Sequence, residues 1–265
     1  MRRTEGRPFL KWAGGKRWMV KEIAEVAPSN FHRYFEPFLG GGAFFFENSP
    51  WPATLSDINE ELINLYRMVR DDVDGLISRL RRLRIDKSTF SDLRNRQCQL
   101  PITRAVRMLY LNRTAFNGLY RVNQKGVFNV PFGCKPGTAV CDCDNLRRAS
   151  EQLQNRSLTV CDFETSFASA KPGDFIFADP PYTTFHDNNG FRRYNEVLFS
   201  WADQLRLAES TVNARRRGVH VVVANANHPS IRELYSDFSV STVLRFSRVS
   251  AQQKGRSRVT ECLFH

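Results

Sequence analysis

The stretch FIFADPPY at residues 175–182 decides how the rest of the chain is interpreted. Its four apolar residues predict a strand buried on both faces, and the polar residue that follows predicts where that strand ends. Pro180 and Pro181 donate no N–H and fix φ, so the turn after Asp179 is stiff and its carbonyl groups point in set directions. A plain strand-ending turn is the alternative, because Asp and Pro are common in turns.

On either side of this stretch, other segments are also predicted to be strands that end in polar or glycine-rich turns. These segments are residues 33–38 before LGGG, 53–55 before Ser56-Asp57, 158–160 before Cys161-Asp162, and a further strand at 219–224. Strands that alternate with helical periodicity are the pattern of a parallel sheet with crossover helices, so the predicted class is α/β. Ligands of such sheets bind at the carboxyl ends of the strands, which makes these turns the candidate sites.

The interval between the second and third of these strands is too long for one crossover. It is rich in Arg and has helical periodicity at residues 60–69, 73–83 and 103–111. Residues 112–132 contain Asn-Gly and Lys-Gly pairs among aromatic residues, which predicts a hairpin or long loop. We therefore expect a discontinuous core of residues 1–59 and 157–265, with an inserted, mostly helical module at 60–156.

The composition is that of a folded, basic protein. Lys and Arg number 39 against 27 Asp and Glu, a net charge of +12, which favours a nucleic-acid partner, although many basic proteins have none. No segment approaches the ~20 apolar residues of a membrane span, and the N-terminus lacks the apolar core of a secretion signal. We expect a cytoplasmic protein with no membrane partner and no obligate protein partner.

The cysteines favour free thiols over a metal site. The six of them form no CxxC pair and have no paired His spacing. The short spacing of Cys134, Cys141 and Cys143 leaves zinc as the alternative.

The turn at residues 179–182 suits chemistry on an exocyclic amine such as that of adenine, whose lone pair is delocalised into the ring. A carboxylate and a backbone carbonyl, each accepting one N–H, can aim that lone pair at an electrophilic methyl group while an aromatic ring stacks on the base. Asp179, the carbonyl of Pro180 and the ring of Tyr182 fit these roles.

A second candidate site follows the first strand, at EPFLGGGA, residues 36–43, whose glycines permit close approach of a ligand. It is not the GxGxxG pattern, and Gly14-Gly15-Lys16-Arg17 is not a P-loop. Asp57 ends the second strand, where an acidic side chain commonly accepts the ribose hydroxyls of an adenosine; a helix N-cap is an equal alternative. Asp162 could accept the adenine amino group of a cofactor, with the same alternative.

In combination, these residues resemble the Dam-type family of DNA-adenine N6-methyltransferases. Four blocks occur in the family's order: FLKWAGGK at 9–16, EPFLGGGA at 36–43, LYLNR at 109–113 with NGL at 117–119 and FNVPFG at 128–133, and DPPY at 179–182. The resemblance implies a Rossmann-like S-adenosylmethionine-dependent methyltransferase core with an inserted DNA-recognition domain. It also implies that the target adenine is flipped out of double-stranded DNA.

The resemblance assigns roles to individual residues. The catalytic set is Asp179, Pro180, Pro181 and Tyr182, with no metal. The resemblance implies an S-adenosylmethionine site built from Trp12, Lys16, Asp57 and Asp179, with Gly40 and Gly42 beneath the methionine portion. We add Glu36 and Asp162 to the expected cofactor-binding set from their positions at strand ends. The DNA-reading set is Lys11, Phe116, Asn117, Leu119, Arg121 and Pro131.

In the family the hairpin loop reads a site that is typically GATC. Arg121 would face a guanine edge, Leu119 and Pro131 a thymine methyl, and Lys11 the first guanine. Phe116 and Asn117 would fill the gap left by the flipped base. The sequence departs from the family at Phe116, where Tyr is frequent, and at Cys134, where relatives can carry a basic residue; local packing is the alternative role for the aromatic loop residues.

Other functions fit part of the pattern. The Asp-Pro-Pro-Tyr chemistry would also serve cytosine N4 or an RNA base. An inactive DNA-binding relative is disfavoured by the intact Asp179, Tyr182 and Lys16, and a dinucleotide oxidoreductase by the missing GxGxxG. Membership of a restriction-modification, phage or housekeeping system is left open.

Overall fold

The computed structural model describes residues 6–123, 126–134, 137–183, 199–246 and 258–265. Within these ranges seven strands form one sheet in the order β3-β2-β1-β4-β5-β7-β6. The strands are β1 (Tyr34–Glu36), β2 (Ala53–Asp57), β3 (Ser157–Val160), β4 (Phe175–Ala178), β5 (His220–Ala226), β6 (Val240–Phe246) and β7 (Arg258–Phe264). β1 runs parallel to β2 and β4, and β4 to β5, whereas β7 is antiparallel to β5 and β6. The predicted α/β class is confirmed, and the antiparallel β7 makes the sheet mixed rather than purely parallel.

The predicted helical segments at residues 60–69, 73–83 and 103–111 are also confirmed. The helices are α1 (Val20–Val26), α2 (Ala43–Asn48), α3 (Glu60–Asp71), α4 (Val73–Arg81), α5 (Lys87–Asn95), α6 (Pro101–Thr114), α7 (Cys143–Leu153), α8 (Phe163–Ser169), α10 (Trp201–Arg216) and α11 (Pro229–Leu234), with a 3-10 turn η1 (Phe116–Gly118). Asn59, Asp72 and Asp86 are the N-caps of α3, α4 and α5. The side chain of each accepts a hydrogen bond from the backbone N–H of the residue three positions later. None of the helices in the described part of the chain has the length and apolar character needed to cross a membrane.

The chain divides into two compact units. The first comprises residues 1–17, 39–50 and 57–160, and the second comprises residues 18–38, 51–56 and 161–265. In the first unit, the ring of Phe9 lies 5.9 Å from that of Phe46 in α2 and 5.1 Å from that of Tyr66 in α3. These contacts explain why the N-terminal segment belongs with the helices. The domain boundaries expected from the sequence stay a prediction.

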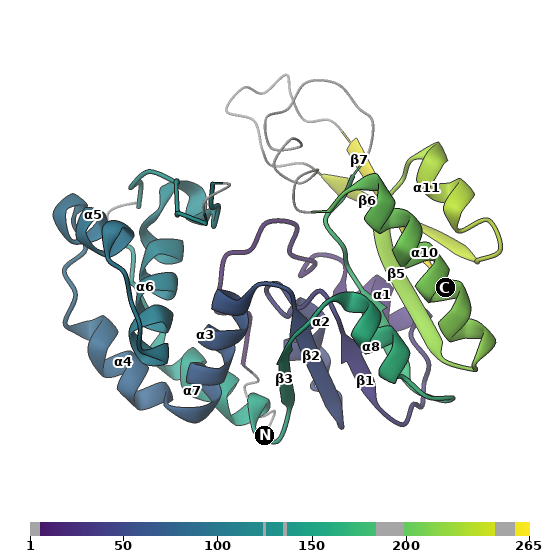
Figure 1. Cartoon of the computed structure of the whole chain (residues 1–265), viewed down its shortest axis with the longest axis horizontal. Helices are drawn as coiled ribbons and strands as arrows, with labels where there is room; N and C mark the ends of the chain where they lie inside the picture. The colour runs from purple at the N-terminus through teal and green to yellow at the C-terminus, as the bar shows by residue number, and fades with distance from the viewer. Residues whose placement is uncertain (1–5, 124–125, 135–136, 184–198, 247–257) are drawn as a thin grey trace. The chain divides into compact units, whose positions relative to one another are not determined.

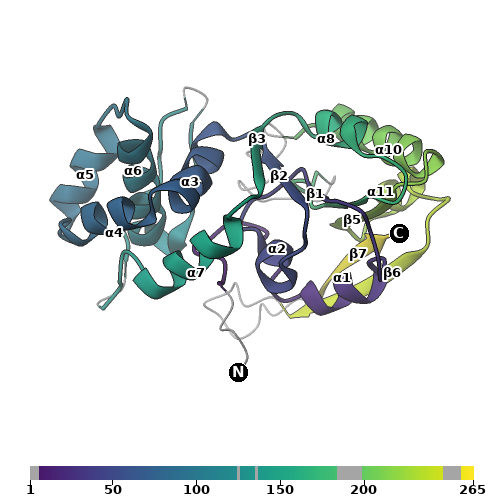
Figure 2. The same cartoon turned by 90° about the horizontal axis from the view of Figure 1, so that it is seen from below.

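The second unit is built around β4, which is fully buried. One apolar cluster joins Val221 and Val223 of β5 to Leu207 of α10 and Phe167 of α8. Figure 1 and Figure 2 show α8 and α10 on one face of this part of the sheet and α1 on the other. Covering both faces accounts for the uninterrupted apolar run of β4.

Candidate active site and nucleic-acid interface

The Asp-Pro-Pro-Tyr turn leaves the carboxyl end of β4, as the sequence predicts. Tyr34 and Phe35 of β1 pair with Phe175 and Ile176 of β4, so Glu36 lies at the same edge of the second unit. Glu36 is buried and accepts a hydrogen bond from the Tyr34 hydroxyl at 2.8 Å. Burial, with the neighbouring carboxylate, holds the pKa of Tyr34 well above its ordinary value, so this phenol remains a donor.

Three hydrogen bonds hold the turn after Asp179. Gln204 Nε2 donates to the carbonyl oxygen of Pro181 at 3.3 Å, and the Tyr182 hydroxyl donates to Glu261 Oε2 at 2.7 Å. Thr183 Oγ1 donates to the carbonyl oxygen of Phe199 at 2.5 Å. Sequence reasoning missed these partners, because they lie on other elements and carry no local motif.

Asp162 is the N-cap of α8. Its Oδ1 accepts from the backbone N–H of Glu164 at 2.9 Å and from Arg206 Nη2 at 3.1 Å. Arg206 also pairs with Glu164 and Asp203, and its guanidinium lies 4.9 Å from the centroid of the Phe163 ring. The capping alternative is therefore confirmed for Asp162, and its cofactor role stays a prediction.

In the first unit, the glycine-rich turn closes around Trp12. Gly40 has φ +47, and a Cβ placed there would lie 2.8 Å from Trp12 Cδ1. Gly42 has φ +63 and is the N-cap of α2. The carbonyl of Gly40 accepts a hydrogen bond from the Tyr66 hydroxyl at 3.0 Å. Only glycine fits position 40, because a side chain there would need both left-handed backbone and displacement of an indole ring.

Lys16 lies in the same unit and is buried, with 4% of its surface exposed. Its ammonium donates to the carbonyl oxygen of Gly14 at 2.9 Å. The amine is thus held close to its own backbone rather than extended into solvent.

Asp57 ties the end of β2 to the glycine turn. Its Oδ2 accepts from Gly40 N–H at 3.1 Å and its Oδ1 from Asn59 N–H at 2.9 Å. The N-cap alternative for Asp57 is wrong, because Asn59 caps α3 by accepting from Leu62 N–H. Burial raises the pKa of Asp57 to about 6, although the backbone N–H donors lower it.

The predicted reading loop folds back on itself within the first unit. Antiparallel bridges join Ala115 to Phe132 and Val122 to Phe128, and α6 extends to Thr114. The Phe116 N–H donates to the carbonyl oxygen of Pro131 at 2.9 Å, which places these two predicted DNA-contacting residues together. Of the predicted Lys-Gly pair, Lys125 lies outside the described ranges.

The predicted DNA-contacting side chains of this loop differ in exposure and restraint. Phe116 is 53% exposed, and the neighbouring Asn117 has left-handed backbone with φ 55. Leu119 is half-buried. Arg121 Nε donates to Asn129 Oδ1 at 2.8 Å, which restrains its guanidinium.

Asn112 attaches Lys11 to this loop. It is fully buried; its Oδ1 accepts from the Lys11 N–H at 3.0 Å, and its Nδ2 donates to the carbonyl oxygens of Lys11 at 2.8 Å and Gly118 at 3.2 Å. A Cβ at position 118 would overlap the Lys11 side chain. The sequence placed Asn112 in a motif block but gave it no role.

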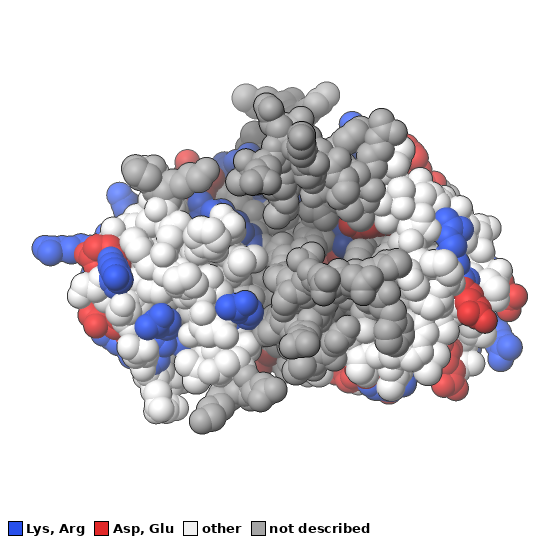
Figure 3. Space-filling model, turned by 90° about the horizontal axis from the view of Figure 1, so that it is seen from above, with Lys and Arg blue, Asp and Glu red and all other residues white. Residues whose placement is uncertain are grey.

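Surface charge is mixed rather than uniformly basic. Figure 3 shows basic and acidic side chains interspersed on the face that it presents. In the first unit, Arg104 pairs with Glu60 and Glu61 at 2.8 and 2.7 Å, and Arg147 pairs with Asp74 at 2.9 Å. Such pairs neutralise part of the positive surplus.

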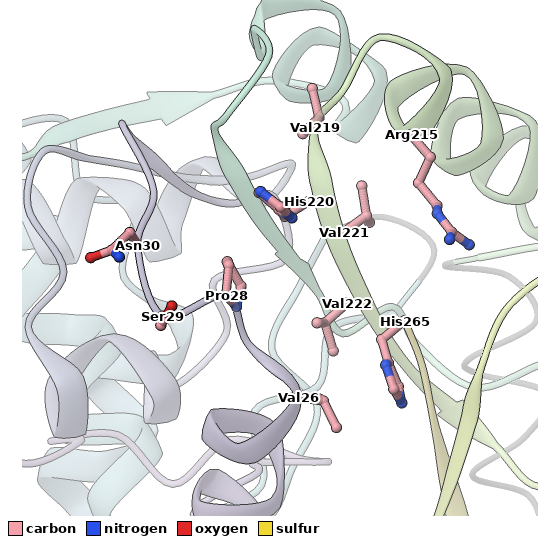
Figure 4. A pocket seen from close by; sticks show the side chains of 10 residues that line it. All are labelled: Val26, Pro28, Ser29, Asn30, Arg215, Val219, His220, Val221, Val222 and His265. Atoms are coloured by element: carbon pink, nitrogen blue, oxygen red, sulfur yellow. The ribbon is translucent and has the colours of Figure 1, made fainter.

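A cavity of about 450 Å³ lies in the second unit, and Figure 4 labels the side chains that line it. These residues lie at and just after the end of α1, at the end of α10, at the start of β5 and directly after β7, and they include Arg215, His220 and His265. His220 opens β5, whereas Asp179 follows the last residue of the parallel neighbour β4. Because ligands of α/β sheets bind at carboxyl ends, we do not assign this cavity to the reaction.

The cysteines are unbridged, with Cys141 Sγ and Cys143 Sγ 3.5 Å apart. Within the described ranges, no cluster of three or more His, Cys, Asp or Glu side chains is arranged to hold a metal ion.

The sequence profile of the D12 class N6 adenine-specific DNA methyltransferases matches residues 12–249. The chain belongs to this family. This D12 class methyltransferase is 37% identical over 267 residues to the type II methyltransferase M1.LlaDCHI of Lactococcus lactis subsp. cremoris, covering 97% of this chain and 94% of that protein. It is 33% identical to the DNA adenine methylase of Haemophilus influenzae, covering 97% and 92% of the two chains. It is 36% identical to the DNA N-6-adenine-methyltransferase of Escherichia phage P1, covering 95% of this chain and 34% of that protein.

The D12 class enzyme is therefore an adenine-specific DNA N6-methyltransferase, as predicted. Its reaction class implies S-adenosylmethionine as the methyl donor.

Proposed function

We propose that this enzyme transfers the methyl group of S-adenosylmethionine to N6 of an adenine flipped out of a GATC site in double-stranded DNA. The observation that carries the proposal is the Asp-Pro-Pro-Tyr turn at the carboxyl end of β4, with the Pro181 carbonyl and the Tyr182 hydroxyl both hydrogen-bonded. A turn fixed in this way suits a reaction that depends on aiming a lone pair.

Asp179 and Pro180 hold the target amino group in this scheme. The Asp179 carboxylate and the Pro180 carbonyl each accept one N–H of the amino group, which turns its lone pair toward the methyl donor. The Tyr182 ring stacks on the base. Bound S-adenosylmethionine supplies an electrophilic methyl group on a sulfonium centre. As positive charge develops on N6, the Asp179 carboxylate stabilises it.

The residues of the first unit fit the cofactor. The bare backbone of Gly40 and Gly42 leaves space that side chains would fill, next to the Trp12 indole. The Asp57 carboxylate accepts the backbone N–H groups of Gly40 and Asn59 and has further lone pairs with which to accept a ribose hydroxyl. Lys16 is the cationic member of this set.

Glu36 and Asp162 are the cofactor residues that we propose in the second unit, with Asp179. Both lie at carboxyl-terminal turns or strand ends, where ligands of this fold class bind. Asp162 would accept the cofactor's adenine amino group in addition to its capping bond.

The loop residues fit the reading of GATC. Arg121 would donate two hydrogen bonds to a guanine edge, and Leu119 with Pro131 would contact a thymine methyl. Exposed Phe116, with Asn117, would occupy the space that the flipped adenine leaves. Lys11, fixed by Asn112, would contact the first guanine.

The test is methyl transfer from labelled S-adenosylmethionine to a duplex containing GATC and to a matched duplex in which it is changed to GTAC. Products are digested to nucleosides and separated. We expect N6-methyladenine from the first duplex only, with Asp179→Ala inactive yet still DNA-binding and the exposed-site variant Asp237→Ala active. Label on cytosine, greater transfer to RNA, or equal labelling of both duplexes would overturn the substrate assignment.

A further inference from the structure

A series of hydrogen-bonded, buried side-chain amides contacts the Asp-Pro-Pro-Tyr turn, and the proposed reaction gives these amides no role. Gln204 of α10 and Asn225 of β5 are both fully buried. The Ala226 N–H donates to Asn225 Oδ1 at 2.8 Å, Asn225 Nδ2 donates to Gln204 Oε1 at 3.0 Å, and Gln204 Nε2 donates to Pro181 O at 3.3 Å. Burying an amide group costs free energy unless the group is hydrogen-bonded, and the last hydrogen bond of this series goes to the turn.

In this amide series, each group donates a hydrogen bond to the next group toward Pro181. The backbone N–H of Ala226 obliges Asn225 to present its oxygen there and its NH₂ to Gln204. Gln204 must in turn present its oxygen to Asn225 and its NH₂ to Pro181. Through these two side chains, the backbone N–H of Ala226 in β5 therefore sets the orientation of the Pro181 carbonyl.

Gln204 is itself held rigidly. Ser200 and Asp203 form a reciprocal capping box at the start of α10, with the Ser200 N–H donating to Asp203 Oδ2 at 2.8 Å and the Asp203 N–H to Ser200 Oγ at 3.2 Å. Gln204 N–H donates to the Ser200 carbonyl at 3.1 Å. The side chain thus leaves a fixed first turn.

Glu261 holds the next residue of the turn from the other face of the sheet. In the antiparallel pair, Asn225 lies opposite Cys262 and Ala226 lies opposite Glu261. Directly opposed residues share a face and successive residues alternate, so Asn225 and Glu261 are on opposite faces. Glu261 is 4% exposed, and its Oε2 accepts from the Tyr182 hydroxyl at 2.7 Å.

We propose that Gln204, oriented by Asn225, and Glu261 are positioning residues that set the Asp-Pro-Pro-Tyr turn from both faces of the sheet. Gln204 fixes the Pro181 peptide plane, and Glu261 fixes the plane in which the Tyr182 ring meets the base. This inference rests on the proposed function.

Gln204→Glu tests the first contact. An ionised Glu cannot donate to Pro181 O, whereas a protonated one can, and burial raises the pKa of a carboxyl group. We expect kcat to fall about tenfold to a hundredfold at pH 8, in line with the cost of misplaced reacting groups. The ratio of variant to wild-type kcat should rise as pH falls toward 6. A wild-type rate at pH 8, or a deficit equal at every pH, would overturn the role of Gln204.

Thr211→Val is the matched control for Gln204→Glu. Thr211 is fully buried on the same helix and donates to the Leu207 carbonyl of that helix at 2.7 Å, and no hydrogen bond joins it to the Asp-Pro-Pro-Tyr turn among the described residues. Its loss should lower thermal stability without a pH-dependent change in kcat relative to wild type.

A second variant set tests Glu261 independently of whether Gln204→Glu folds. Glu261→Gln keeps an acceptor for Tyr182 and should retain kcat within about threefold, whereas Glu261→Leu and Tyr182→Phe should each lower kcat. The double variant Tyr182→Phe with Glu261→Leu should have a kcat no lower than that of the poorer single variant, because both substitutions remove the same hydrogen bond. Additive losses would overturn the pairing.

Hydrogen exchange at the amides of residues 182 and 183 gives a readout that does not depend on activity. We expect faster exchange in Gln204→Glu and Glu261→Leu than in wild type and Thr211→Val. If the wild type made no N6-methyladenine, the proposed function would fail, while this exchange pattern would still decide the positioning roles. Unchanged exchange in both variants would reject them.

Discussion

The Trp12 ring stacks on the Tyr120 ring, with centroids 5.6 Å apart and planes inclined by 20°. Trp12 also lies against Gly40 of the glycine turn, and Tyr120 packs on Phe128 of the loop at 5.6 Å. Within the first unit, one aromatic contact therefore joins the proposed cofactor turn to the proposed DNA-reading loop.

This contact predicts that Tyr120 affects cofactor affinity without being a cofactor residue. Tyr120→Ala should weaken S-adenosylmethionine binding by about 2- to 12-fold, the equivalent of an aromatic pair worth about 0.5–1.5 kcal/mol. Tyr120→Phe should bind like wild type, because it keeps the ring. Calorimetric titration of the three proteins checks this, and equal affinity in Tyr120→Ala would contradict it.

Gly40→Ala should damage both stability and cofactor binding. Its φ of +47 would cost Ala about 1–2 kcal/mol, and the new Cβ would displace the Trp12 ring. Gly137→Ala is the control, because Gly137 has φ +78 but no heavy atom of the described residues lies within 4 Å of an added Cβ. Urea unfolding should show a loss in both variants, while S-adenosylmethionine affinity should fall at least about tenfold only in Gly40→Ala.

Asp57 predicts a pH dependence of cofactor binding. Its pKa is raised to about 6 by burial, so its carboxyl group gains a proton as pH falls through about 6 and loses one acceptor for a ribose hydroxyl. S-adenosylmethionine affinity should therefore rise between about pH 5 and pH 7 and then level off. Asp57→Asn should bind more weakly at pH 7 and lack this rise. The same rise in Asp57→Asn would assign it to another group.

Arg121→Ala should relax the preference for one guanine, with a loss of about 1–3 kcal/mol of discrimination. Asn129→Ala should have a smaller effect in the same direction, because it frees the guanidinium that Asn129 now holds at 2.8 Å. Single-turnover methylation of duplexes substituted at each base of GATC measures both. A uniform loss across all duplexes would instead indicate a phosphate contact.

Several features of the fold follow from local pattern alone. The apolar run of β4 and the Asp-Pro-Pro-Tyr sequence after it are contiguous, so the strand, its end and its chemistry can be predicted together. The helices α3, α4 and α6 carry the periodicity of an amphipathic or buried face. No strand is predicted beyond residue 224, yet β6 and β7 complete the sheet there. Their pairing with β5 and with each other depends on packing against partner strands that are distant in the sequence.

Capping shows the limit of local pattern at single residues. Asp57 and Asp162 both follow strands and precede helices, and either could be an N-cap. The structure gives the cap of α3 to Asn59 and turns Asp57 toward Gly40, while Asp162 does cap α8. Whether Asp57 caps α3 depends on the position of the glycine turn, because the Gly40 N–H occupies an oxygen of the Asp57 carboxylate.

By itself, the sequence determined the α/β class, the strand that precedes the Asp-Pro-Pro-Tyr turn and the chemistry that we propose for that turn, because these reside in contiguous residues. Only the tertiary structure decided which buried polar groups hold the proposed functional residues of each unit: Asn112 for Lys11, Gln204 for Pro181 and Glu261 for Tyr182. A buried donor or acceptor must find a partner, but nothing in its neighbourhood along the chain says which one. That choice is made when distant elements pack and water is excluded between them.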